Sequence, residues 1–240
     1  MIDTRHDGRV RVLTLNRPEK RNALNLYICS ALVDALEQAN DDASVAAILL
    51  TANGKAFCAG MDLSEAQTAD RTQLNEVHER LFTINTRLRK PLIAAVHGAA
   101  LAGGTGLVAN AHIVVADDQS TFGLTEIRIA LFPILIFRSV KAAMGERRTT
   151  ELALTGRTFT AAQAKDYGLV HEIAEDPEAR AAEIANHLSR LDSQAIAHGL
   201  TYITQTRDKP WDEAGLIGSR IRAEALQNPA FQEAIHAFQK

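Results

Sequence analysis

Residues 91–116 read PLIAAVHGAALAGGTGLVANAHIVVA and form the most apolar stretch of the chain. Their pattern predicts a buried strand at 92–96, a glycine- and alanine-rich turn that becomes a helix over 98–109, and a second strand at 113–116. Two strands joined by a helix form a right-handed crossover within a parallel sheet. The stretch therefore predicts an α/β fold.

A transmembrane helix is the competing interpretation of a stretch this long. Against it, His97, Asn110, His112 and four glycines interrupt the apolar residues. The stretch is also rich in alanine rather than in leucine or isoleucine, which are the residues that favour insertion into a bilayer. We therefore expect no membrane span.

The segments on both sides continue the alternation of strands and helices. Asp7-Gly8 is a turn signal ahead of an alternating strand at 10–15, and the apolar run at 45–50 is typical of a buried strand. Asn25 is a candidate N-cap of a helix, and the apolar face of that helix comprises Ile28, Leu32, Ala35, Leu36 and Ala39. The other predicted elements are an amphipathic helix over 71–90 ended by Pro91, a short helix from Thr160 to Gly168, and a strand over 169–173.

The residues after Pro177 have an almost wholly helical pattern, which Pro210 and Pro229 divide into segments. A helical tail of this length has an apolar face that must be buried. The face packs either on the chain's own core or on another subunit.

Length and composition limit the class of protein. At about 150 residues per domain, 240 residues make one large domain, or one domain with an extension. The net charge of −3, with basic residues spread along the chain, argues against nucleic acid as a partner. Cys29 and Cys58 form neither a disulfide framework nor a Cys/His cluster, so we expect no metal site. Because the first residues lack the apolar run of a signal peptide, we expect a cytoplasmic protein.

Residues 54–63, GKAFCAGMDL, follow the predicted strand at 45–50. Small residues at Cys58, Ala59 and Gly60 let the backbone approach a ligand, and free N–H groups in such a turn can hold an anion. The alternative is a strand-to-helix turn in which Asp62 is a cap, and the spacing does not decide between them.

Residues 96–107 also follow a buried strand and begin a helix, whose glycine-rich N-terminus supplies free N–H donors. Gly104-x-Gly106-x-x-Ala109 matches a loose nicotinamide-dinucleotide pattern, but it does not lie in a first βαβ unit. Packing of a helix against a sheet is the simpler explanation of these small residues.

Residues 120–127 place Glu126 beside an apolar run that continues to Leu135. A buried carboxyl in such surroundings has a raised pKa, which suits a general acid or base. The alternative is a glutamate in the first turn of a helix, stabilised by the helix dipole. The chain has no nucleophile elbow, P-loop or H-E-x-x-H motif.

Four motifs in this order resemble the enoyl-CoA hydratase/isomerase (crotonase) family. They are NRPEKRNAL at 16–24, FCAGMDL at 57–63, the glycine-rich 97–106, and TGR at 155–157 with 161–170. The resemblance implies a crotonase-like spiral of ββα units over residues 1–190. It also implies a helical C-terminal region, 191–240, that joins subunits into a homotrimer or hexamer. The implied substrate is an acyl-CoA thioester, and no cofactor is needed because coenzyme A is part of the substrate.

The resemblance also implies roles for single residues. The backbone N–H groups of Met61 and Gly103 form an oxyanion hole for the thioester oxygen, and Glu126 is the catalytic acid/base. The substrate-binding positions implied are Arg21, Ala23 and Ala59 for coenzyme A, together with Asp62, Leu63, Gly104 and Gly106. Fixed donors at the oxygen lower the barrier because enolate formation builds negative charge there.

One departure from the family pattern bears on the reaction. Hydratases of the family carry two glutamates, and the first of them falls on Gly106, which has no side chain. A single carboxylate can still move a proton between carbons, so double-bond isomerisation is favoured over hydration. On this basis Gly106→Glu should raise hydratase activity. Hydration would otherwise need a substitute group, such as His97, His112 or Glu146. The other hypotheses are an acyl-CoA-binding protein without turnover and a nicotinamide dehydrogenase.

Overall fold

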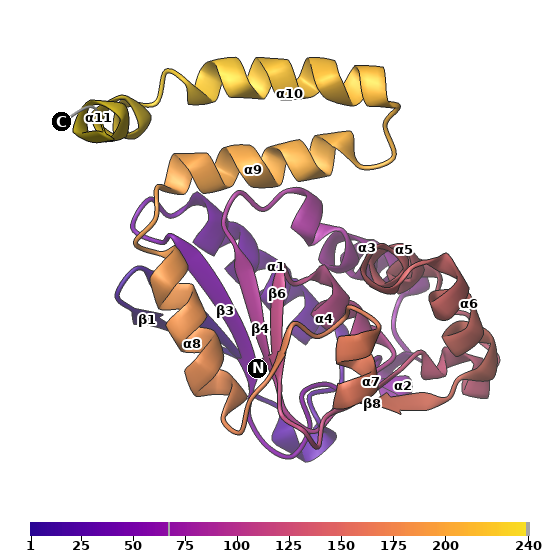
Figure 1. Ribbon diagram of the computed structural model, residues 1–240. Coiled ribbons are helices and arrows are strands. Elements are labelled where there is room, and N and C mark those ends of the chain that lie inside the picture. The colour runs from indigo at the N-terminus through magenta and orange to yellow at the C-terminus, as the bar shows by residue number, and fades with distance from the viewer. Residues whose placement is uncertain (67, 239–240) are drawn as a thin grey trace.

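The computed structural model describes residues 1–66 and 68–238, and its centre is a mostly parallel sheet (Figure 1). The strands of this sheet, in chain order, are β1 (Ile2–Asp7), β2 (Val10–Leu15), β3 (Ala47–Ala52), β4 (Leu92–Val96), β6 (Ile113–Ala116) and β9 (Glu172–Ile173). They lie side by side in that same order. β1 and β2 form the predicted antiparallel hairpin, and all later pairs are parallel. The predicted parallel sheet is confirmed.

The helices that precede the C-terminal region lie on both faces of this sheet and beside it (Figure 1). They are α1 (Leu26–Asp41), α2 (Leu63–Ala66), α3 (Arg71–Phe82), α4 (Gly103–Asn110), α5 (Ile134–Met144), α6 (Glu146–Thr155), α7 (Ala161–Asp166) and α8 (Pro177–Leu188), with 3-10 turns η1 (Pro18–Lys20), η2 (Ile84–Thr86) and η3 (Thr125–Ile129). Ala181 and Ala185 of α8 pack on one face, against Val10, Leu49 and Ile93. The larger apolar core fills the other face, under α1, α3 and α4.

Two predicted helix caps are confirmed. The Asn25 side chain accepts a hydrogen bond from the Ile28 N–H at 2.9 Å, so α1 begins where the sequence pattern predicts. Thr160 and Gln163 exchange hydrogen bonds at the start of α7 and form a capping box.

Three predicted element boundaries are wrong, and the first is the strand expected at 45–50, which lies at Ala47–Ala52. The helix expected over 71–90 ends at Phe82, where the Thr83 hydroxyl donates to the Glu79 carbonyl at 2.8 Å and η2 follows. The strand expected over 169–173 is confined to β9. The N–H groups of Leu169 and Val170 instead bind the Ala164 carbonyl, at 2.9 and 3.2 Å, and close α7.

A second, smaller sheet stands beside the first and was not predicted. It joins β5 (Ala99–Leu101), β7 (Thr121–Gly123) and β8 (Thr158–Thr160) in that order. Residues 99–101 were expected to be turn, but they form a strand that pairs with β7 on one side and with Cys58 on the other. The Cys58 N–H donates to the Ala99 carbonyl at 3.0 Å, and the Leu101 N–H donates to the Cys58 carbonyl at 2.9 Å. This pairing brings residues 57–61 alongside the start of α4.

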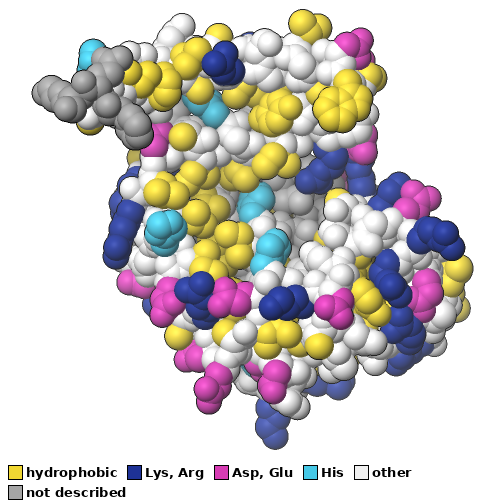
Figure 2. Space-filling model, in the orientation of Figure 1, with side chains coloured by type: hydrophobic (Ala, Val, Ile, Leu, Met, Phe, Trp, Pro, Cys, Tyr) yellow, Lys and Arg dark blue, Asp and Glu magenta, His cyan; other side chains and the backbone are white. Residues whose placement is uncertain are grey.

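The C-terminal helices are α9 (Ser193–Thr206), α10 (Trp211–Ala225) and α11 (Pro229–Phe238), and they lie beyond one end of the sheet (Figure 1). Pro210 and Pro229 separate them as predicted. Within the described chain α9 has no buried residue, and Trp211 and Leu216 of α10 are 95% and 75% exposed. Figure 2 shows hydrophobic side chains over these helices. The apolar face of the tail is thus left largely uncovered by the chain's own core.

The division into a core over 1–190 and a tail over 191–240 stays a prediction, and residues 239–240 lie outside the described part. In that part, no helix combines the length and the apolar character that crossing a membrane requires.

Candidate active site

A cavity of about 850 Å³ opens between α3, η3, the N-terminal end of α5 and the paired segments 57–61 and 99–103. Its lining includes five residues that the sequence assigned to the site: Ala59, Met61, Leu63, Gly103 and Glu126. The wall from Ile129 to Ile136 is almost wholly apolar. A concave, mostly apolar cavity with a few polar groups is the usual form of a small-molecule site.

Two backbone N–H groups on this cavity are free to donate. Leu24 pairs with the residues on either side of Met61: its N–H donates to the Gly60 carbonyl, and its carbonyl accepts from the Asp62 N–H. Among the described residues, the Met61 N–H has no recorded acceptor. Gly103 is the first residue of α4, whose first-turn N–H groups lack partners inside the helix. Together they can stabilise negative charge on a bound oxygen.

The two segments that carry these donors pack without side chains between them. A Cβ at Gly104 would overlap the carbonyl oxygen of Cys58, and one at Gly103 would lie 3.1 Å from Leu24 Cδ1 and 3.2 Å from Phe82 Cζ. Glycine at 104 therefore allows the two donor segments to approach this closely. Gly104 itself is buried and does not line the cavity.

Glu126 is a titratable group of this cavity whose pKa is strongly shifted. Burial raises the pKa of its carboxyl to about 7, because the surroundings disfavour the charged form. Its Oε2 is buried and has no hydrogen-bond partner among the described residues. A carboxyl that titrates near neutral pH can both accept and return a proton.

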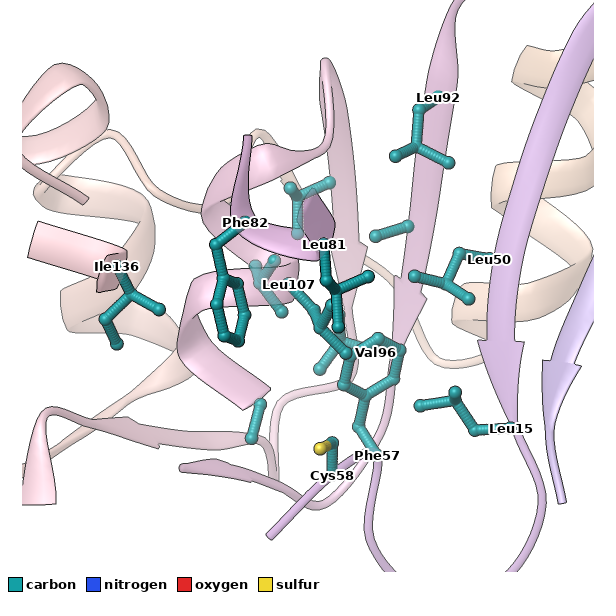
Figure 3. Packing of buried hydrophobic residues seen from close by; sticks show 14 of the residues in the cluster. Leu15, Leu50, Phe57, Cys58, Leu81, Phe82, Leu92, Val96, Leu107 and Ile136 are labelled. Carbon is teal, nitrogen blue, oxygen red and sulfur yellow. The ribbon is translucent and has the colours of Figure 1, made fainter. Parts of the chain in front are cut away.

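Protein atoms fill the space beside Gly106. A Cβ at this position would overlap Ile136 Cγ2 and would lie 3.1 Å from Phe82 Cε1. Figure 3 shows Phe82 between Ile136 and Leu107. Gly106 is buried and does not line the cavity, so a side chain placed there needs room that Ile136 now occupies. A glutamate introduced at position 106 alone would therefore clash with Ile136, so the gain in hydratase activity expected for Gly106→Glu requires that Ile136 be changed as well.

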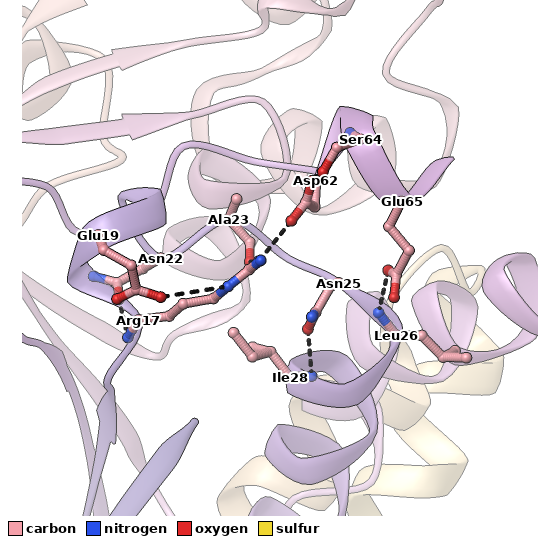
Figure 4. Close-up of polar contacts among 10 residues, drawn as sticks. All are labelled: Arg17, Glu19, Asn22, Ala23, Asn25, Leu26, Ile28, Asp62, Ser64 and Glu65. Atoms are coloured by element: carbon pink, nitrogen blue, oxygen red, sulfur yellow. Dashed lines mark hydrogen bonds and ion pairs between the residues drawn. The ribbon is translucent and has the colours of Figure 1, made fainter. Parts of the chain in front are cut away.

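Asp62 anchors the site and does not line it. Its carboxylate accepts from Arg17 Nη1 at 2.6 Å and from the Ser64 N–H at 3.0 Å (Figure 4). The Ser64 hydroxyl and the Arg17 guanidinium hold the pKa of this carboxyl down at about 2. With these partners engaged, Asp62 fixes the end of the Met61 segment.

Arg21 and Ala23 lie next to the site segments but do not line the cavity. The Arg21 carbonyl accepts from the Ala59 N–H at 2.9 Å, and the Arg21 side chain is exposed. The Ala23 carbonyl accepts from Arg17 Nη1 at 3.3 Å. Neither residue lines the cavity, although Arg21 adjoins Ala59, which does.

The three residues considered as substitutes for a second acid/base do not line the cavity. His97 Nε2 lies 2.9 Å from the Gly54 carbonyl oxygen, and the Leu92 N–H donates to His112 Nδ1 at 2.9 Å. Burial lowers the pKa of His112 to about 4. Glu146 pairs with Lys141 on the surface.

Sequence reasoning missed His78 and Phe82, which line the cavity from α3. The buried positions of α3 are Leu74, Val77, His78, Leu81 and Phe82. This i, i+3, i+4, i+7, i+8 spacing marks one face of a helix, and His78 stands on it where an apolar residue is expected. That irregularity was the available signal.

The glycine pattern at 104–109 has a structural explanation. Both Gly104 and Gly106 face protein atoms, which fill the space that a bound dinucleotide would use. In the described residues, no group of three or more His, Cys, Asp or Glu side chains is placed to hold a metal ion.

The chain is similar to known proteins along nearly its whole length. The family model for enoyl-CoA hydratase/isomerase matches residues 5–239. Enoyl-CoA hydratase EchA19 of Mycobacterium tuberculosis is 32% identical, covering 96% of this chain and 90% of the relative. The 2,3-dehydroadipyl-CoA hydratase of Escherichia coli is 34% identical, covering 88% and 84%. The crystal structure of a Mycobacterium smegmatis enoyl-CoA hydratase superposes with a TM-score of 0.93 at 30% identity, covering 99% and 95%. The predicted fold class is confirmed.

Proposed function

The chain belongs to the enoyl-CoA hydratase/isomerase family and is an enzyme that acts on acyl-CoA, and we propose that its reaction is isomerisation of a 3-enoyl-CoA to a 2-enoyl-CoA. One observation carries the proposal. Gly106, where the family resemblance implies the first glutamate of a hydratase, has no side chain, and the space beside it is filled by Ile136 and Phe82. Glu126 remains as the buried carboxyl on the cavity.

The proposed reaction needs one group that both takes and returns a proton. Ionised Glu126 removes a proton from C2, and the electron pair spreads over C2, C3, C4 and the thioester oxygen. The N–H groups of Met61 and Gly103 donate to that oxygen; losing one such donor typically costs about 2.7–4 kcal/mol of transition-state stabilisation. The protonated Glu126 then returns the proton to C4, and the double bond moves to C2–C3. The reaction therefore needs neither a water molecule nor a second acid/base.

Hydration is the second candidate, because the relatives compared are named as hydratases. Hydration requires a second group, in addition to Glu126, that positions the attacking water molecule at the double bond. Gly106 offers none, so hydration would depend on a residue outside the family pattern.

Restoring a carboxylate tests this distinction. Because Gly106→Glu alone overlaps Ile136, the variant to make is Gly106→Glu with Ile136→Ala. We expect its hydratase activity on a 2-enoyl-CoA to rise about tenfold or more above Ile136→Ala, since a general acid/base contributes about 10²–10⁴-fold when well placed.

Ile136→Ala alone is the control for the enlarged cavity. A folded double variant that binds acyl-CoA and shows no gain in hydration would contradict the role assigned to position 106.

The site residues beyond the acid/base follow the family resemblance. Ala59 and Leu63 are proposed to contact the pantetheine arm, and exposed Arg21 is proposed to contact the nucleotide. We also propose that α9–α11 bury their exposed apolar side chains, Trp211 and Leu216 among them, against other copies in a homotrimer or hexamer. Light scattering of the purified protein measures the mass of the assembly, which should be three or six times that of one chain.

A further inference from the structure

His78 is a buried polar side chain of the cavity that the proposed reaction does not use. It lies on α3 with 7% of its surface exposed, and it lines the cavity with Met61, Gly103 and Glu126. Its ring centroid is 6.0 Å from that of Phe82, one turn further along the helix. Phe82 in turn packs beside Gly103, which carries one of the two proposed oxyanion donors.

The imidazole of His78 has a buried nitrogen without the kind of backbone partner that His112 and His171 have. Its Nε2 is buried without a hydrogen bond among the described residues. By contrast, His112 Nδ1 and His171 Nδ1 each accept from a backbone N–H, at 2.9 and 3.1 Å. Buried polar atoms in folded proteins nearly always have a partner, and a binding site is where a ligand can supply it.

The charges around His78 indicate which ligand group fits. Burial lowers its pKa, although the nearby Glu65 opposes this, so the ring is neutral near pH 7 and offers one donor and one acceptor. Glu65 itself is engaged, because its Oε2 accepts from the Leu26 N–H at 2.7 Å. Exposed Glu76 and Glu79 flank His78 on α3, and Arg128 lies on the facing segment. This excess of acidic groups disfavours a carboxylate and leaves an uncharged oxygen as the fitting partner.

We infer that His78 selects the acyl group: it hydrogen-bonds to an uncharged hydroxyl or carbonyl oxygen on the acyl chain of the substrate. The inference rests on the proposed function, because it takes the cavity as the acyl site. The apolar wall from Ile129 to Ile136 holds the hydrocarbon part, while α3 supplies the polar contact. A plain alkyl chain packs on the apolar wall but leaves His78 Nε2 without a hydrogen-bond partner.

Binding of saturated acyl-CoAs tests the inference without turnover. Hexanoyl-CoA, 5-hydroxyhexanoyl-CoA and 6-hydroxyhexanoyl-CoA are titrated calorimetrically into the purified protein. We expect at least one hydroxylated ligand to bind about tenfold more tightly than hexanoyl-CoA, as one buried neutral hydrogen bond allows. His78→Phe should abolish or reverse this preference, and His78→Gln should restore part of it.

His187→Phe is the matched control, since His187 is exposed on α8, and α8 packs on the sheet face away from the cavity. It should keep the wild-type preference. Equal Kd values for all three ligands in the wild type, or a preference that survives His78→Phe, would overturn the inference.

Kinetics separate this inference from the proposed function. Because the saturated ligands cannot react, a hydroxyl preference stands even if the protein fails to isomerise 3-enoyl-CoA. The converse result, isomerase activity without any preference, removes the role of His78 and leaves the reaction in place. If His78→Phe instead abolishes kcat on every substrate and changes its pH dependence, His78 is an acid/base and the specificity role is rejected.

Discussion

Glu126→Gln lowers kcat/KM for a 3-enoyl-CoA by about 10³-fold or more. The amide keeps the size of the side chain, but it can neither accept the C2 proton nor return it to C4, and general acid–base catalysis is typically worth about 10²–10⁴-fold. Steady-state kinetics with chromatographic product analysis measure the loss. Binding of a saturated acyl-CoA should be nearly unchanged, since the oxyanion donors are backbone groups. A variant that keeps more than a tenth of wild-type activity would move the role elsewhere.

The pH dependence of the wild type follows from the same residue. Because burial raises the pKa of Glu126 to about 7, the carboxylate that takes the proton is lost as the pH falls through 7. We expect kcat/KM to decline below that pH along a single ionisation. The residual activity of Glu126→Gln should lack this ionisation.

The same substitution should stabilise the fold at alkaline pH. The pKa of Glu126 is higher in the folded chain, about 7, than the ordinary value of 4.5, so the folded state binds the proton more tightly. The stability that this proton contributes is complete below pH 4.5 and is lost as the pH rises through 7. Glu126→Gln removes the cost of burying the charge, about 2–3 kcal/mol at pH 8. Urea unfolding at pH 4.5 and pH 8 should show the gain at pH 8 only.

Gly104→Ala is expected to damage both the fold and the reaction. The added methyl group would overlap the Cys58 carbonyl oxygen, which also accepts the Leu101 N–H at 2.9 Å. To remove this overlap, the 57–61 segment must move away from α4. That movement increases the separation between the Met61 N–H and the Gly103 N–H. Loss of an oxyanion donor lowers kcat by about 10²–10³-fold, and overpacking costs about 1–3 kcal/mol of stability.

Gly8→Ala is a control for loss of a glycine at a distance from the cavity. Gly8 has a φ of +56° in the β1–β2 turn, and a Cβ there meets no atom within 4 Å. Gly8→Ala should lower the free energy of unfolding by about 1 kcal/mol, because alanine is strained in a left-handed backbone conformation, and it should leave kcat unchanged. If Gly104→Ala matched this control in both kcat and stability, the close packing would not set the donor geometry.

The parts of the fold with a strong local signal could be predicted from the sequence. The strands at 92–96 and 113–116 coincide with β4 and β6, because each is a short apolar run bounded by breakers. The start of α1 follows from Asn25, because an asparagine at the N-cap position accepts a hydrogen bond from an N–H group that has no partner within the helix. The segments at 54–63 and 96–107 stand out as runs of small residues after buried strands, but the residues alone left ligand binding and close packing as alternatives, and only the family resemblance assigned them to the site.

The parts that depend on contacts distant in sequence could not be predicted. Residues 99–101 become β5 because they pair with β7 and with Cys58, and their sequence, Ala-Ala-Leu, has no strand pattern of its own. That the space beside Gly106 is filled depends on Ile136 and Phe82, which are 30 and 24 positions away. Asp62 could be placed at the site but not assigned its anchoring role, since that role needs Arg17.

The central claim is that one carboxylate moves a proton between carbons and no water is added. The most direct measurement gives the wild-type protein 3-hexenoyl-CoA and, separately, 2-trans-hexenoyl-CoA, and resolves the products by chromatography. We predict conversion of the 3-enoyl substrate to 2-trans-hexenoyl-CoA with little 3-hydroxyhexanoyl-CoA from either substrate. Rapid formation of 3-hydroxyhexanoyl-CoA from the 2-enoyl substrate, without isomerisation of the 3-enoyl substrate, would contradict it.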